Sequence, residues 1–126
     1  MRCLIDTHVL LWSVMAPERL SAGARKILRN PRTEILVSHA SAWELVLKAE
    51  RLHLPITITS FLDQAMAGLG AHWMPIELRH FLAVADLPVI HGDPFDRLLI
   101  AQSDCEQVPL LSADANVARY PIQVIW

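Results

Sequence analysis

Residues 2–12, RCLIDTHVLLW, set the pattern on which the fold is built. The apolar run 2–5 has the length of a short buried strand, and it ends at Asp6. The residues from Thr7 to about Met15 favour a helix, which must end before Pro17. A strand, an acid and a helix therefore follow one another within fifteen residues.

The same alternation of strand and helix continues to the end of the chain. Further strands are expected at 34–38, 71–76, 108–112 and 122–126, and helices at 20–30, 40–52, 59–70, 77–87, 94–105 and 113–120. We expect Ser21 to cap the second helix, and Gly68 and Gly70 to end the helix 59–70. Short apolar strands that alternate with helices predict an α/β fold, in which a parallel sheet is covered on both faces. A chain of 126 residues without repeats or linkers predicts a single domain over residues 1–126.

Composition restricts the cellular context and the partners. The net charge of −2 gives no overall attraction to nucleic acid, although a local basic patch could still provide one. Hydrophobic residues make up 53% of the chain, and this surplus suggests burial in an oligomer or a partner contact. Cys3 and Cys105 are expected to be free thiols in a reducing compartment. With no signal-peptide pattern and no apolar run of ~20 residues, we expect a cytoplasmic protein without membrane association.

Four acids are expected at one edge of the predicted sheet. Asp6 follows the first strand, Glu44 lies in the helix after the second, and Asp114 follows the fourth. Asp96 begins the helix in residues 91–102, HGDPFDRLLIAQ. Ligands of open parallel sheets bind at the carboxyl ends of the strands, where these acids converge. Each acid alone also has a structural explanation, as a helix cap or, for Glu44, as an ion-pair partner of Lys48.

The stretch HGDPFD contains two acids where a helix needs only one cap. We assign Asp93 as the cap, with Pro94 at the first helical position, and Asp96 as the acid that faces the site. Two like charges ~4 Å apart repel by about 4 kcal/mol at an effective dielectric of 20, so such a cluster needs protons or a cation. Carboxylates without cysteine or histidine partners suit Mg²⁺ or Mn²⁺.

Four segments together resemble the acidic motifs of PIN domains. They are LIDTHVLLW, SHASAWELVLK, HGDPFDRLLIAQ and LSADANVARYPIQVIW, and they occur in the same order as in that family. The likeness is strongest to the VapC-type ribonuclease toxins of bacterial toxin–antitoxin pairs. It implies a three-layer α/β/α sandwich with a central parallel sheet, and a metal-dependent endoribonuclease that hydrolyses RNA phosphodiester bonds.

The resemblance also implies roles for individual residues. Asp6 and Asp96 would hold the principal Mg²⁺ or Mn²⁺, and Glu44 and Asp114 would complete the catalytic and metal-binding site directly or through water. The remaining hydroxyl-bearing candidates would support these acids or contact the substrate; they are Thr7, Ser112 and Ser38. A homodimer and a cognate VapB-type antitoxin are the expected partners beside the RNA.

Several residues and alternatives stay open at this stage. Ser41 is expected to cap its helix and Trp43 to lie in the core, whereas Trp12 and Phe61 cannot be placed. The six histidines are expected mostly at the surface, and His8, His39 and Arg97 lie near the proposed site by sequence alone. The sequence lacks the motifs of phosphatases, of receiver domains, of glycine-rich loops that bind nucleotides, and of zinc sites. A non-catalytic PIN-like module that binds RNA or protein remains the alternative to the nuclease.

Overall fold

Side chains alternate across the central strands and thereby build two separate cores. In β1 (Arg2–Ile5), Cys3 and Ile5 point to one face of the sheet and Leu4 to the other, because successive side chains of a strand point to opposite faces. The neighbouring β2 (Glu34–Ser38) divides its apolar residues in the same way. Both faces of the sheet are therefore apolar and must be covered.

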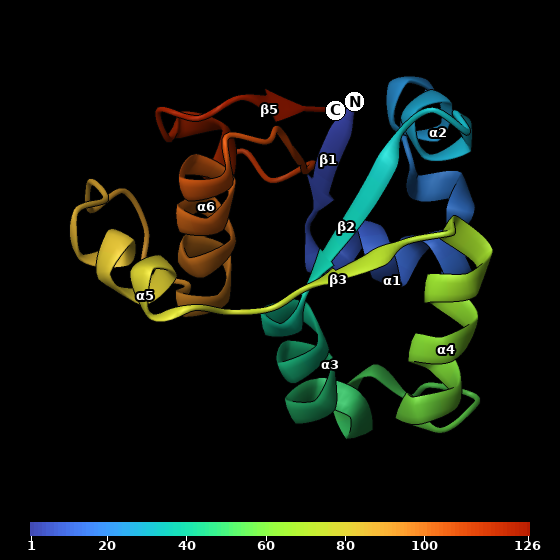
Figure 1. Cartoon of the computed structure of the whole chain (residues 1–126). Helices are drawn as coiled ribbons and strands as arrows, with labels where there is room; N and C mark the ends of the chain where they lie inside the picture. The colour runs from blue at the N-terminus through green and yellow to red at the C-terminus, as the bar shows by residue number, and fades with distance from the viewer.

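The computed structural model describes all residues 1–126 and contains one five-stranded parallel sheet (Figure 1). Beside β1 and β2 it contains β3 (His72–Met74), β4 (Leu110–Leu111) and β5 (Val124–Ile125). The strand order is β3-β2-β1-β4-β5. The chain therefore builds outward from β1 in one direction, and then returns to add β4 and β5 on the other side.

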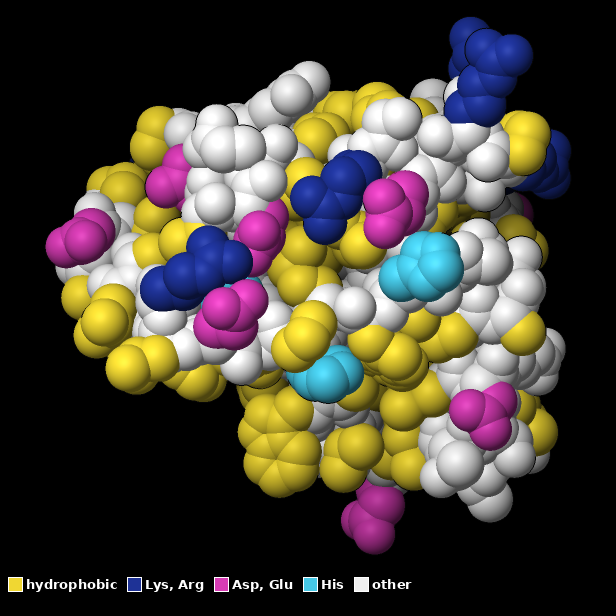
Figure 2. All heavy atoms as spheres, viewed as in Figure 1, with side chains coloured by type: hydrophobic (Ala, Val, Ile, Leu, Met, Phe, Trp, Pro, Cys, Tyr) yellow, Lys and Arg dark blue, Asp and Glu magenta, His cyan; other side chains and the backbone are white.

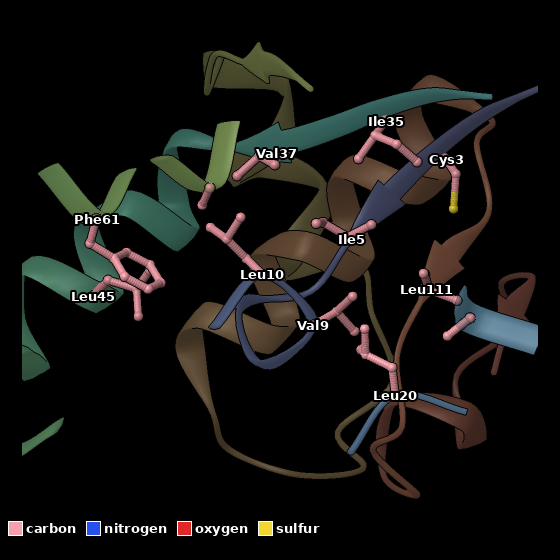
Figure 3. Packing of buried hydrophobic residues seen from close by; sticks show 12 residues of the cluster. Cys3, Ile5, Val9, Leu10, Leu20, Ile35, Val37, Leu45, Phe61 and Leu111 are labelled. Carbon is pink, nitrogen blue, oxygen red and sulfur yellow. The ribbon is translucent and has the colours of Figure 1, made fainter. Parts of the chain in front are cut away.

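Helices cover both faces. The first core joins the sheet to α1 (Thr7–Met15), α2 (Ala22–Arg29) and α4 (Ile58–Leu69), and Figure 3 shows its side chains. The second core joins the opposite face to α6 (Pro94–Glu106), against which α5 (Leu78–Ala85) packs. The helix α3 (His39–Leu52) contributes Leu45 to the first core and Ala40 to the second. The predicted three-layer α/β/α sandwich is confirmed.

Two helices, α2 and α6, begin at the predicted caps. The side chains of Ser21 and Asp93 accept backbone N–H groups of α2 and α6, as expected. The prediction for Ser41 was wrong: Ser38 caps α3 through the N–H of Ala40 at 3.0 Å, and Ser41 lies buried inside the helix. Gly68 is likewise inside α4, because only Gly70 adopts the left-handed backbone (φ 58°) that ends a helix.

The last quarter of the chain is less regular than expected. In place of a helix over 113–120 there is a turn followed by the short 3₁₀ helix η2 (Val117–Arg119). The cause is Asp114, whose side chain accepts the N–H of Asn116 at 2.7 Å and thus competes with helical hydrogen bonding. A second 3₁₀ helix, η1 (Pro17–Arg19), was not predicted. The strands β3, β4 and β5 are also shorter than their apolar runs.

Trp43 corrects the expected core, and Phe61 and His80 add to the set of buried residues. Trp43 is 56% exposed on α3, so its placement in the core was wrong. Phe61 of α4 is fully buried and belongs to the first core. His80 of α5 is also fully buried and is the exception among the histidines, since most of them lie at the surface as expected. Cys3 and Cys105 are free, as expected.

No helix of the structure combines the length and the apolar character that a membrane crossing requires.

Candidate metal centre

The strand order places the candidate site between β1 and β4. Here the connections leave β1 toward β2 on one side and return to β4 on the other. At such a switch point the loops after the two strands diverge and leave a crevice at the carboxyl edge of the sheet. Asp6 follows β1 directly, and Ser112 and Asp114 follow β4.

Asp6 is held rigidly at this point. Its Oδ1 accepts the N–H of Val9 at 3.0 Å, so the carboxylate caps α1, and the residue is only 4% exposed. Burial raises the pKa of Asp6, while the hydroxyl of Ser112 and the N–H of Val9 partly oppose this shift. The ionised carboxylate is thus unfavourable in the unliganded protein, and a cation would relieve that cost.

The two acids at the start of α6, Asp93 and Asp96, have different roles. Asp93 Oδ1 accepts the backbone N–H of Asp96 at 2.9 Å, so Asp93 is the cap. Asp96 Oδ2 instead lies 3.1 Å from Nε2 of His91. Burial raises the pKa of Asp96 to about 6, with smaller contributions from nearby acids and opposition from the His91 hydrogen bond. The acids that raise it include Asp114 and Asp6, so these three carboxylates share one electrostatic environment.

Glu44 approaches the same place from α3. Ser41, one turn before it on the same helix, accepts a hydrogen bond from Thr7 Oγ1 at 3.0 Å, which ties this face of α3 to the start of α1 beside Asp6. Lys48, the ion-pair partner of Glu44, lies with its Nζ 5.7 Å from the ring of Phe95, next to Asp96. Contacts of α3 on either side of Glu44 thus reach the start of α1, which follows Asp6, and the start of α6, which contains Asp96.

One oxygen of Glu44 lacks a partner. Lys48 Nζ donates to Oε2 at 2.5 Å, whereas Oε1 is buried and makes no hydrogen bond. Leaving a buried carboxylate oxygen unpaired is unfavourable. Together with the raised pKa values of Asp6 and Asp96, this unpaired oxygen makes the residues present fit a hard divalent cation with oxygen ligands.

Known proteins share the sequence pattern and the fold of this chain. The PIN domain family matches residues 3–123. The chain belongs to this family. Ribonuclease VapC22 of Mycobacterium tuberculosis is 32% identical over 131 residues, which cover 98% of this chain and 97% of that protein. The resemblance to PIN domains and VapC-type proteins seen in the motifs is confirmed.

Two solved structures share the fold of this PIN domain. VapBC2 from Rickettsia felis, bound to a DNA fragment from its promoter, has a TM-score of 0.77 at 12% identity and covers 99% of this chain and 98% of that chain. A toxin–antitoxin complex from Klebsiella pneumoniae has a TM-score of 0.64 at 17% identity, covering 98% and 96%.

Sequence reasoning missed a chain of hydrogen bonds behind Asp96. The Tyr120 hydroxyl lies 2.8 Å from Nδ1 of His91 and receives a hydrogen bond from Arg97 Nη1 at 3.0 Å. Arg97 and the backbone N–H of His91 both donate to the hydroxyl oxygen, so the tyrosine is left to donate to Nδ1. The Nε2–H of His91 then points at Asp96. Tyr120 lies far along the chain from Asp96, and no local pattern links the two residues.

The predicted hydroxyl residues have structural partners in this PIN domain. Thr7 donates to Ser41, and Ser38 caps α3. Ser112 Oγ accepts the N–H of Asp114 at 3.1 Å, which places the Asp114 loop. His39 lies against Trp73 on the outer strand β3, whereas His8 lines the pocket beside Asp6.

A second group of ligand-type side chains lies away from this site. Nδ1 of His80 accepts the N–H of Glu77 at 3.0 Å and Nε2 lies 3.0 Å from Glu106 Oε1, so both ring nitrogens are occupied. Arg79 also pairs with Glu106. These side chains cap the start of α5 and link it to the end of α6, and this structural role accounts for the group.

The raised pKa of Asp96 predicts how stability depends on pH without metal. Its pKa rises from 3.8 to about 6 on folding, so the folded protein binds more protons in that interval than the unfolded chain. The contribution of this carboxyl to the free energy of unfolding must then fall as pH rises from about 4 to 6. Thermal melts in EDTA across this range should show the fall, and Asp96→Asn should reduce it to the part that Asp6 contributes. An unchanged profile in the variant would contradict the assignment.

Proposed function

We propose that this PIN domain, spanning residues 1–126, is a metal-dependent endoribonuclease and the toxin of a toxin–antitoxin pair. The observation that carries the proposal is the unpaired, buried Oε1 of Glu44, together with the pKa values of Asp6 and Asp96, which burial raises. The 32% identity to Ribonuclease VapC22 over nearly the whole chain supports the substrate class.

Asp6, Glu44, Asp96 and Asp114 would hold Mg²⁺ or Mn²⁺. When bound, the cation supplies a positive charge that stabilises the developing negative charge on a phosphodiester and favours deprotonation of the attacking water. The protein contributes the orientation of the ligands. Val9 fixes the carboxylate of Asp6 and His91 fixes that of Asp96, so neither side chain must be ordered when metal and RNA bind.

The surface supports protein partners. Exposed hydrophobic side chains gather over the region of α3 in Figure 2, and others lie on α5. On α3 they are Trp43, Val46 and Leu47, and on α5 they are Leu78, Phe81 and Leu82. Apolar areas of this kind mark protein contacts. We assign them to a homodimer and to a VapB-type antitoxin, and we place the pair in the cytoplasm.

Cleavage of a mixed RNA pool by the purified chain tests the proposal directly. We expect cleavage with Mg²⁺ or Mn²⁺, none with EDTA, and none with Asp96→Asn. RNA that stays intact under all conditions, while calorimetry detects metal binding, would favour the non-catalytic RNA- or protein-binding module. The absence of both cleavage and metal binding would refute the metal centre itself.

His91 should matter although it is not proposed to touch the metal. His91→Ala removes the donor that orients Asp96, and loss of such a support commonly costs about 10–100-fold in metal affinity or activity. We expect cleavage to require a higher Mg²⁺ concentration, measured as the half-saturating Mg²⁺ in single-turnover reactions. The exposed His72 of β3 provides the matched control, His72→Ala. Equal Mg²⁺ dependence in both variants would show that His91 does not position Asp96.

A further inference from the structure

A pocket extends from the acids toward the start of the chain's first loop. Its volume is about 260 Å³, and both acids and aromatic and basic side chains line it. The acids are Asp6 and Asp114, and the other side chains include His8, Trp12 and Arg19. The proposed metal site accounts for the two acids and leaves the other side chains to be explained.

The aromatic side chains that line this pocket lie on α1. His8 and Trp12 are four residues apart on this helix and therefore share a face, with ring centroids 5.6 Å apart. Trp12 also meets Trp126, the last residue after β5, edge-on at 6.0 Å. Since contacts from two directions hold it, the Trp12 ring is a fixed platform beside the acids.

Arg19 lies on this platform. The 3₁₀ helix η1 turns the chain back after α1 and brings the guanidinium carbon of Arg19 to 4.3 Å from the centroid of the Trp12 ring. A guanidinium over an indole face is attracted electrostatically, so the flexible arginine side chain is held in place. The arginine thus presents its hydrogen-bond donors at the rim of the pocket.

The charge of Arg19 is not used within the protein. No carboxylate lies within ion-pair distance of its guanidinium. Several other basic residues on the surface are also unpaired, so what distinguishes Arg19 is its contact with Trp12 and its place in the pocket beside the acids. An anchored but unpaired guanidinium is suited to an anionic ligand, and its planar donors match the oxygens of a phosphate.

We propose that Arg19, anchored on Trp12, binds a backbone phosphate of the RNA that flanks the cleaved bond. The inference rests on the proposed nuclease function, since the acids in the same pocket would act on the scissile phosphate. Successive phosphates of one strand would then meet the metal centre and the guanidinium in turn. A partner protein could offer a carboxylate instead, but continuity of the pocket with Asp6 and Asp114 favours the RNA backbone.

Removal of single charges from the RNA tests the contact. The probe is an RNA oligonucleotide that the wild type cleaves at one bond, synthesised with an uncharged methylphosphonate at each flanking position in turn. One position should slow single-turnover cleavage about tenfold, as expected for loss of a charge-assisted hydrogen bond. Arg19→Ala should slow cleavage of the unmodified RNA by a similar factor and should be insensitive to modification at that position alone. If its effect multiplies with every modification, the proposal is wrong.

A binding measurement separates this inference from the nuclease proposal. In an Asp96→Asn background, fluorescence anisotropy of a labelled RNA needs no cleavage. Each phosphate contact to a single strand contributes about 0.7 to the slope of log affinity against log salt, so Arg19→Ala should reduce that slope by about this amount. Arg32→Ala is the matched control, because Arg32 lies beside Met1 at the opposite edge of the sheet. An unchanged slope for Arg19→Ala would overturn the contact, as would weakened binding of the antitoxin with unchanged binding of RNA.

Discussion

Asp6→Asn should strongly slow metal-dependent RNA cleavage and leave the fold intact. Asparagine keeps the oxygen that accepts the Val9 N–H but loses the charge that attracts the cation. A bound metal contributes several kcal/mol of charge stabilisation, so we expect a loss of roughly a hundredfold to a thousandfold in the cleavage rate. Single-turnover cleavage with saturating Mg²⁺ measures it.

Stability provides the control for this variant. Burial raises the pKa of Asp6, so its ionised form destabilises the metal-free protein at neutral pH. Asp6→Asn should therefore melt at the same temperature as the wild type or higher in EDTA. Mg²⁺ should raise the melting temperature of the wild type and not that of the variant. A variant that still cleaves RNA at the wild-type rate would exclude Asp6 from the site.

The second large effect concerns the core. Phe61 is fully buried in the first core and lies beside Leu45 in Figure 3. Phe61→Ala should lower the free energy of unfolding by about 3–5 kcal/mol, because it removes a large apolar side chain and leaves a cavity. Much of a small domain's total stability of roughly 5–15 kcal/mol would be lost. Urea unfolding measures the change.

Phe81 offers a matched comparison for the core variant. It is 52% exposed on α5, so at a concentration at which the chain is monomeric Phe81→Ala should change the unfolding free energy by no more than about 0.5 kcal/mol. If both variants lost the same stability, the burial difference between the two phenylalanines would not describe the protein in solution.

The sequence predicted those parts of the fold that depend on local signals. The run RCLI, the cap at Asp93 and the helix after it are local, and they appear where expected. The exposed Trp43 could not be predicted, since the face that α3 presents to the sheet depends on how helices pack. The turn at Asp114 replaced a helix because one side chain competed successfully for the backbone.

The same distinction between local and long-range signals applies to the candidate site. Asp6, Glu44, Asp96 and Asp114 could be named from their places after strands and at helix starts, and their roles stay a prediction. The supports could not be named, because they come from distant parts of the chain: Tyr120 acts on Asp96 through His91, and Ser41 receives Thr7 from another helix. Partnerships of this kind exist only after folding.

The double role of Asp6 has a genetic consequence. Both aspartate codons become asparagine codons by a single G-to-A transition, and asparagine caps a helix as well as aspartate does. If the chain is a toxin, a cell that loses its antitoxin can therefore survive by one transition that leaves a folded, harmless protein. Such a protein keeps the surface by which it would bind an antitoxin. The inactive protein would then compete with active toxin for the same antitoxin in cells that carry both.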